Sequence, residues 1–243
     1  MAKWQERAAL LFTAEGIQKL ENANVLVVGV GGVGSFAAEF LVRAGIGKLT
    51  IVDGDVVDIT NINRQLPALH STIGQSKVQL MQKRLLDINP ELKITCLEEF
   101  LSPERAFEIV STEFDYVLDC IDSVTPKLNL ILGAKRKRVK IISCMGAGGK
   151  MDASKVKVAD INNSENCKLA RTIRRRLKEH QIDKVKVVFS SEIQDESSLK
   201  MTDGKNFKKS FYGTNSWMPC LFGLYAAETA IKYLLKKNNN QTT

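Results

Sequence analysis

Short apolar runs and longer amphipathic stretches alternate along this chain. The runs are rich in valine, isoleucine and leucine and are bounded by glycine or polar residues, which is typical of strands buried on both faces of a sheet. Between them, apolar residues recur every three or four positions, as on one face of a helix. Strands are expected to begin at or near Val25, Lys48, Lys93, Tyr116, Lys140, Val156 and Val185.

The helical stretches lie between these strands, apart from one that precedes them and one that follows. They are expected over residues 5–20, 35–43, 74–89, 103–110, 125–137, 167–180 and 219–236. Ser102 and Pro103 fit a helix cap and a first helical position. Strands that alternate with helices predict a mostly parallel sheet with right-handed crossovers, and hence an α/β fold.

The clearest motif is GVGGVG, which joins the strand at Val25 to the next helix. Gly29, Gly31 and Gly34 have the spacing of a dinucleotide-binding turn, with Gly32 between them. The free N–H groups and the positive dipole end of the following helix attract phosphate. The expected fold class is therefore a Rossmann-like, mostly parallel sheet with a nucleotide-binding glycine turn, elaborated by an irregular C-terminal region.

A chain of 243 residues suits one such domain. We expect a nucleotide-binding core in residues 1–149, and a substrate-binding elaboration with a packing helix in residues 150–243. The polar segment between Ser190 and Ser210 is the best candidate for a mobile loop.

Composition excludes several classes of protein. The net charge of +8 favours an anionic partner and leaves nucleotide, nucleic acid and membrane surface open. The five cysteines contain no CxxC pair, so neither paired zinc ligands nor a disulfide framework is predicted, and a reducing cytoplasm fits best. The amino terminus lacks the apolar core of a secretory signal, and the uncharged stretches 22–38 and 211–227 fit a glycine turn and a buried helix, not membrane spans.

The residues after the second predicted strand indicate which nucleotide is bound, NAD or ATP. Asp53 would hold a ribose hydroxyl of either NAD or ATP. Arg64 and Lys77 favour ATP because they supply two cations for a triphosphate, although a solvated surface charge is the plainer interpretation of each. The expected ATP-binding set is Gly29, Gly31, Gly32, Gly34, Asp53, Asp55, Asn63, Arg64, Gln65 and Lys77.

Two aspartates stand at the end of the strand from Tyr116, where open α/β sheets bind their ligands. We favour Asp122 as the residue that holds Mg²⁺ against phosphate oxygens. Asp119 can serve simply to cap the strand end.

GVGGVG, IVDGDVVDITNINRQ, Lys77 and DCIDS together resemble the adenylation domain of ubiquitin-activating enzymes and their ThiF- and MoeB-like bacterial relatives. The resemblance implies that Asp53 binds ribose, that Arg64 and Lys77 bind phosphates, and that Asp122 acts on magnesium or pyrophosphate. It also implies that Arg7 reaches into the active site of a partner subunit, and hence a homodimer. Arg7 is equally consistent with an exposed helix residue. The implied catalytic residues are Arg7, Arg64, Lys77 and Asp122.

The second half of the chain indicates which member of this superfamily the sequence resembles. Bacterial sulfur-carrier activators usually have two zinc-binding CxxC pairs, and their absence here indicates a zinc-free member. The segments MGAGGKMD, CKLARTIRRRLK and YGTNSWMPCLFGLYAAE resemble the tRNA threonylcarbamoyladenosine dehydratase family. That resemblance implies ATP-dependent cyclisation of threonylcarbamoyladenosine beside the tRNA anticodon, through an acyl-adenylate.

The densest basic stretch is our candidate tRNA contact, although a solvated helix face is the plainer alternative. It contains Lys168, Arg171, Arg174, Arg175, Arg176 and Lys178, to which we add Lys205, Lys208 and Lys209. The run KRKRVK from Lys135 is interpreted as a solvated face. MGAGGKMD is either a pocket for substrate or a monovalent cation, or a turn between strands. Cys167 is interpreted as a partly buried residue at a helix start, not as an acyl acceptor.

Three functions remain in view. The first is an ATP-dependent tRNA-modifying dehydratase. The second is an activator of the C-terminus of a ubiquitin-like or sulfur-carrier protein, which the missing CxxC pairs and the basic second half disfavour. The third is a non-catalytic or NAD-binding module, which Arg64 and Lys77 disfavour. A sulfur-relay protein stays open as a further partner.

Overall fold

The computed structural model describes residues 2–201 and 210–237. Its main sheet has seven strands: β1 (Asn24–Val28), β2 (Lys48–Val52), β3 (Lys93–Leu97), β4 (Tyr116–Asp119), β5 (Lys140–Cys144), β6 (Val156–Asp160) and β7 (Lys186–Ser190). Their order is β3-β2-β1-β4-β5-β7-β6, and every neighbouring pair is parallel except β6 with β7. The prediction of a mostly parallel sheet is confirmed.

Seven α-helices accompany the sheet in the described residues: α1 (Glu6–Asn22), α2 (Gly34–Ala44), α3 (Lys77–Ile88), α4 (Pro103–Glu108), α5 (Val124–Arg136), α6 (Lys168–Glu179) and α7 (Trp217–Lys236). Short 3-10 turns occur at Lys3–Gln5, Ile59–Asn61, His70–Thr72, Ala153–Lys155, Ile161–Asn163 and Glu196–Ser198. None of the described helices is long and apolar enough to cross a bilayer.

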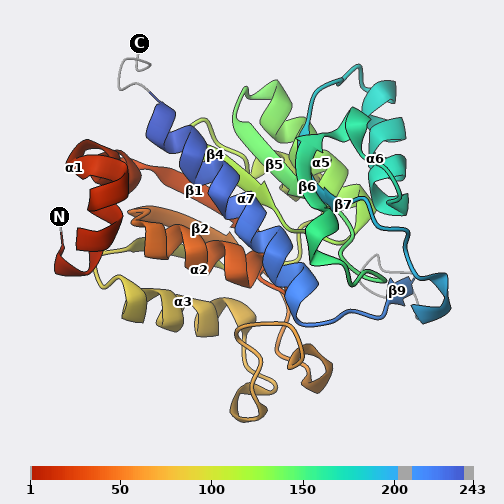
Figure 1. Cartoon of the computed structure of the whole chain (residues 1–243), viewed down its shortest axis with the longest axis horizontal. Coiled ribbons are helices and arrows are strands. Elements are labelled where there is room, and N and C mark those ends of the chain that lie inside the picture. The colour runs from red at the N-terminus through yellow and green to blue at the C-terminus, as the bar shows by residue number, and fades with distance from the viewer. Residues whose placement is uncertain (1, 202–209, 238–243) are drawn as a thin grey trace.

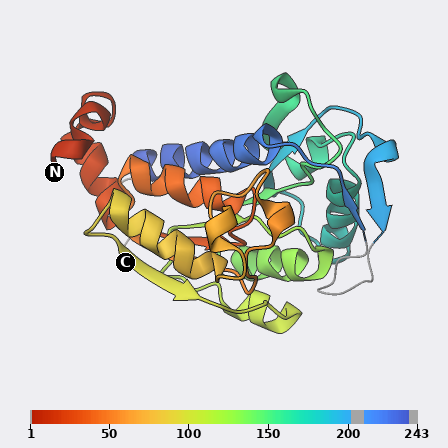
Figure 2. The same cartoon turned by 90° about the horizontal axis from the view of Figure 1, so that it is seen from below.

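The helices form a layer on each face of the sheet (Figure 1, Figure 2). Alternation along β1 explains why, because Val25 and Val27 pack in one hydrophobic cluster and Leu26 and Val28 in another. The first cluster includes residues of α1, α2, α3 and α7, and the second includes residues of α4, α5 and α6. Because β1 is buried on both faces, its sequence is a continuous apolar run.

The strand order places a switch point between β1 and β4. From β1 the chain builds outward through β2 and β3, whereas from β4 it builds the other way through β5. The loops after β1 and β4 therefore leave the sheet in opposite directions, which opens a crevice at the carboxyl ends of these two strands. Because β5 pairs with β7, the sheet continues across residue 149 into the second half of the chain.

Two local features differ from the sequence expectation. The first helix is broken at Thr13 (φ 67°, ψ 165°), whose hydroxyl accepts a hydrogen bond from Gly16 N at 3.3 Å. The polar segment after Ser190 contains two unanticipated strands, β8 (Leu199–Met201) and β9 (Ser210–Tyr212), which pair antiparallel. Residues 202–209 of the predicted mobile loop, with Lys205, Lys208 and Lys209, and the NNNQTT tail lie outside the described residues.

Candidate active site

The glycine turn lies at the switch point, pressed against the loop that follows β4. Gly29 has φ +86°, and a Cβ atom on it would lie 3.0 Å from the carbonyl oxygen of Cys120. A Cβ atom on Gly34 would lie 1.7 Å from the carbonyl oxygen of Gly29, so no other residue fits there without moving the turn. Around Gly31 the nearest described atoms belong to the Gln65 side chain, 3.7 Å or more from a built Cβ.

Asp53 follows β2 and links the glycine turn to the loop beyond it. One carboxylate oxygen accepts a hydrogen bond from Val30 N at 2.8 Å, and the other accepts one from Asp55 N at 2.9 Å. Burial raises the pKa of Asp53, and the charge of Lys77 and the two N–H donors oppose that shift. This carboxylate is therefore held against the glycine turn, where the sequence predicts ribose binding.

Lys77 is buried beside the same carboxylates. It is the first residue of α3 and is 4% exposed, so the interpretation as a solvated surface charge is wrong. Its Nζ lies 2.9 Å from Asp55 Oδ2, and the Asp55 side chain is 47% exposed. A buried cation whose partner faces solvent is well placed to hold an incoming anion, because burial weakens the screening of its charge by water.

Arg64 extends from the loop after β2 toward the loop after β4. Its guanidinium donates hydrogen bonds of 2.8 Å to Thr60 O and to Asn63 Oδ1. Burial lowers the pKa of Arg64, and the Asp122 carboxylate opposes this shift. The structure thus brings Arg64 and Asp122 into electrostatic contact across the crevice. Asn63 also donates to Thr214 O at 2.8 Å, which ties this loop to the segment before α7.

Gln65 provides an independent test of whether a ligand fits the crevice. In the described part of the chain, its Oε1 is buried and has no hydrogen-bond partner. An unpaired buried acceptor is costly, at about 1–3 kcal/mol. Because the Gln65 amide faces the glycine turn, a nucleotide hydroxyl or amino group bound there would satisfy it.

Asp119 forms a buried network that the sequence did not reveal. Its carboxylate lies 2.7 Å from Lys127 Nζ, and both side chains are 0% exposed. Lys127 also donates to Cys144 O at 2.9 Å, and Ser143 donates to Asp119. The other carboxylate oxygen accepts from Ile121 N at 3.0 Å, which anchors the loop that carries Asp122. In the sequence, Asp119 and Lys127 are only an aspartate and a lysine eight residues apart, which matches no known motif and did not predict their pairing.

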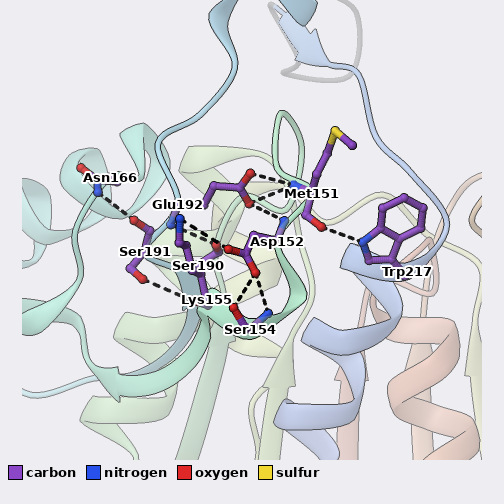
Figure 3. Close-up of polar contacts among 9 residues, drawn as sticks. All are labelled: Met151, Asp152, Ser154, Lys155, Asn166, Ser190, Ser191, Glu192 and Trp217. Carbon is purple, nitrogen blue, oxygen red and sulfur yellow. Dashed lines mark hydrogen bonds and ion pairs between the residues drawn. The ribbon is translucent and has the colours of Figure 1, made fainter.

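Loops from the second half of the chain meet at the same edge of the sheet. After β7, the Glu192 carboxylate accepts hydrogen bonds of 2.8–3.0 Å from Met151 N and Asp152 N, which lie in the segment after β5 (Figure 3). The Trp217 indole donates to Met151 O at 3.0 Å. Both Trp217 and Met151 are exposed, at 44% and 69%. Trp217 begins α7, and two residues later Pro219 contacts the glycine turn, since its Cβ would be 3.2 Å from a Cβ on Gly32.

The MGAGGKMD segment is held by backbone contacts. Gly148 O accepts from Gln194 Nε2, and Gly149 N donates to Gly213 O. Lys150 is buried and donates to Asn166 O at 3.1 Å and to Ser190 O at 2.6 Å, and burial lowers its pKa. Cys167 is buried, and its sulfur accepts from Ala170 N as the cap of α6, as the structural interpretation of this thiol expects.

The remaining candidates lie outside the crevice. Arg7 is exposed on α1, which Figure 1 and Figure 2 place away from the loop that carries Arg64. On α6, Arg171 and Arg175 are exposed, and Arg176 is half-buried. Arg174 instead donates to Ile161 O and Ser164 O, and Lys168 pairs with Glu196 at 2.8 Å.

The chain is similar to known proteins over nearly its whole length. Residues 5–243 match the ThiF family. A tRNA threonylcarbamoyladenosine dehydratase of Bacillus subtilis is 38% identical over 238 residues, covering 95% of this chain and 94% of the relative. The Escherichia coli tRNA N6-threonylcarbamoyladenosine dehydratase, TcdA, in complex with ATP superposes with a TM-score of 0.87 at 33% identity, covering 100% of this chain and 99% of that one. Its complex with AMP gives a TM-score of 0.86 at 34% identity, with 97% and 96% covered. The chain therefore belongs to the ThiF family and, within it, to the tRNA threonylcarbamoyladenosine dehydratase family.

Proposed function

We propose that this protein uses ATP to convert threonylcarbamoyladenosine in tRNA into its cyclic form, with the net loss of one water. The observation that carries the proposal is the crevice at the switch point, where the glycine turn meets Asp53, Arg64, Lys77 and Asp122. A site built of N–H donors and cations suits phosphate chemistry. The likeness to whole-length relatives of that activity supports the choice of substrate.

The reaction takes two steps. A threonyl carboxylate oxygen bonds to the α-phosphorus of ATP, and the bond from this phosphorus to the bridging oxygen breaks, releasing pyrophosphate. The carbamoyl group then attacks the acyl carbon and loses a proton, and AMP leaves with the former carboxylate oxygen. Attack within one molecule has an effective molarity on the order of 10⁵ M or more, so no enzyme thiol is needed.

Different residues of the crevice would bind the phosphates, the ribose and the leaving pyrophosphate. The N–H groups of the glycine turn and the start of α2 hold phosphate oxygens. Asp53, with Asp55 and Gln65 near it, holds the ribose side. Arg64, supported by Asn63, and Lys77 offset the negative charge that develops as pyrophosphate leaves.

Asp122 is the residue that would hold Mg²⁺. In the described residues no three His, Cys, Asp or Glu side chains gather as metal ligands. Phosphate oxygens and waters would therefore complete the octahedral shell, which is usual for Mg²⁺ bound through one or two carboxylates. The ion would neutralise charge on the phosphates. A monovalent cation at the MGAGGKMD backbone belongs to the same proposal.

The tRNA would approach over the loops drawn in Figure 3. Exposed Trp217 offers a flat aromatic face on which a base can stack, close to the glycine turn. Arg171 and Arg175 are the exposed arginines of α6 and would contact phosphates. Lys168, Arg174 and Arg176 belong to the same proposed footprint, with Lys168 and Arg174 already engaged within the chain.

A homodimer is part of the proposal. The helix α1, which carries Arg7, lies away from the loop of Arg64 (Figure 1, Figure 2). Exposed Trp4, Leu10 and Leu11 lie near Arg7 in the sequence and are 42%, 89% and 78% exposed. Such an apolar surface around a cation suits a subunit interface. We also propose a cytoplasmic location, since the substrate is tRNA, and keep a sulfur-relay protein as a candidate partner.

The decisive experiment mixes purified protein, ATP and Mg²⁺ with tRNA that carries threonylcarbamoyladenosine. Mass spectrometry of the digested tRNA should find a nucleoside lighter by one water, together with one AMP and one pyrophosphate per product. The control is the same tRNA without the threonylcarbamoyl group, which should give no AMP. If a sulfur-carrier protein stimulates pyrophosphate exchange while the tRNA yields no product, the protein-activating alternative holds instead.

A further inference from the structure

A basic cavity of about 510 Å³ opens on the described surface, away from the crevice. Its walls carry the five cations Lys135, Arg138, Lys140, Lys184 and Lys186 and one carboxylate, Asp160. Five cations against one carboxylate leave four net positive charges, half of the chain's net +8. A volume of this size is in the range of pockets for small molecules, about 300–1,000 Å³.

The cavity lies at the opposite end of the sheet from the glycine turn. Tyr116, Lys140 and Lys186, which line it, are the first residues of β4, β5 and β7. The carboxyl ends of these strands lead into the crevice instead. A strand of five residues such as β5 is about 16 Å long, so one ligand phosphate cannot serve both places.

The cations of the cavity lie close together. None of the five makes an ion pair with a described residue. Lys140 lies over the Tyr233 ring, 5.7 Å from its centroid. Burial lowers the pKa of Lys135, and the charge of Lys140 lowers it further, more than nearby Asp160 restores it. Repulsion of this kind is relieved when an anion binds.

The basic residues of the run KRKRVK lie in two different environments. Arg136 and Lys137 turn onto the Phe107 ring, 5.4 and 5.5 Å from its centroid, and Lys137 also donates to Val110 O. Lys135, Arg138 and Lys140 instead line the cavity. The run is therefore not a uniform solvated face, because part of it forms the wall of a concave site.

We propose that this cavity is a second anion-binding site, separate from the ATP crevice, which takes a phosphate-bearing ligand. Several lysines and an arginine around a concave floor suit phosphate oxygens, and half-buried Tyr233 gives an aromatic wall. The phosphate comes either from the backbone of a bound tRNA or from a free phosphorylated molecule. The site does not depend on the proposed reaction, because none of its residues belongs to the crevice.

The first test measures a small anion directly. The protein is saturated with the non-hydrolysable analogue adenosine 5′-(β,γ-imido)triphosphate to fill the crevice, and tripolyphosphate is titrated by calorimetry. We expect one additional site per chain, weakened at least 10-fold by Lys135→Gln/Arg138→Gln/Lys140→Gln. The matched control is Lys83→Gln/Lys93→Gln/Arg136→Gln, which removes the same charge from exposed positions outside the cavity and should bind as the unmodified protein does.

The second test distinguishes the source of the phosphate. A cavity that contacts tRNA predicts that the same triple variant reduces the slope of log affinity against log salt by about 2, and the control variant by less than about 1. An unchanged slope with lost tripolyphosphate binding identifies a free phosphorylated ligand. Lys184→Glu/Lys186→Glu, on another wall, should reproduce the result if the first variant folds poorly. Equal effects of cavity and control variants, or no effect on either anion, would overturn the proposal.

Discussion

Replacing Lys127 with methionine removes the cation from an ion pair whose side chains are both 0% exposed. Asp119 would keep its hydrogen bonds from Ser143 and from Ile121 N but lose its only counter-charge among the described residues. Breaking a buried pair by removing one partner costs about 3–5 kcal/mol, because the remaining charge is neither solvated nor paired. We expect that loss in the free energy of unfolding, measured by urea denaturation followed by circular dichroism.

A double variant separates charge from packing. Asp119→Asn/Lys127→Met removes both charges, while the amide can still bond to Ile121 N and to Ser143. It should therefore be more stable than the Lys127→Met variant, since replacing both members of a buried pair is often close to neutral. Lys155→Met serves as control: this lysine lies 3.4 Å from Asp152 with both side chains well exposed, and should cost about 0–1 kcal/mol. The reasoning fails if Lys127→Met costs less than about 1 kcal/mol, or if the double variant is no more stable than the single one.

Three further predictions address the crevice and its rim. Lys77→Ala and Arg64→Ala should each slow ATP–pyrophosphate exchange about 100-fold or more without unfolding the protein, and full exchange in both would contradict the phosphate-binding assignment. Gly34→Ala should abolish ATP binding in calorimetry, because its Cβ would lie 1.7 Å from the preceding turn carbonyl; normal affinity would show that the turn yields easily. Trp217→Ala should weaken tRNA binding about 10-fold in a filter assay while Trp217→Phe keeps most of the affinity, and identical affinities for alanine and tryptophan would exclude stacking.

The strands and the glycine turn could be predicted because their causes are local. A strand buried on both faces must be apolar at successive positions, as in β5, where every residue after Lys140 is buried. The bounds of β3 and β5 are the predicted ones. Gly34 is required by a steric contact within the turn itself. Asp53, Arg64 and Lys77 follow this turn in the sequence, and their order indicated a nucleotide site. A parallel sheet brings the carboxyl ends of its strands to one edge, so residues after neighbouring strands are expected to lie together there.

Only the tertiary structure showed how the charges are used, because pairing depends on distances between elements that sequence spacing does not contain. Asp119 was interpreted as a strand cap and is instead half of a buried ion pair with Lys127. Arg174 belongs to a basic helix face in sequence, yet its guanidinium bonds to backbone carbonyls. The break in α1 at Thr13 was also not predicted, because the spacing of apolar residues indicates which face of a helix is buried and not where the backbone changes direction.

The sequence by itself determined the order of the main-sheet strands and the helices along the chain and the glycine turn, since both follow from local sterics and periodicity. The nucleotide-binding residues stay a prediction from the order of residues and the family resemblance. The tertiary structure alone decided which of the charged and polar side chains are buried and which of them are paired among the described residues. Lys77 is buried beside Asp55, Gln65 presents an unpaired oxygen to the crevice, and the KRKRVK run is shared between Phe107 and a cavity. Burial and pairing set the strength of a charge, and both arise only when distant segments pack together.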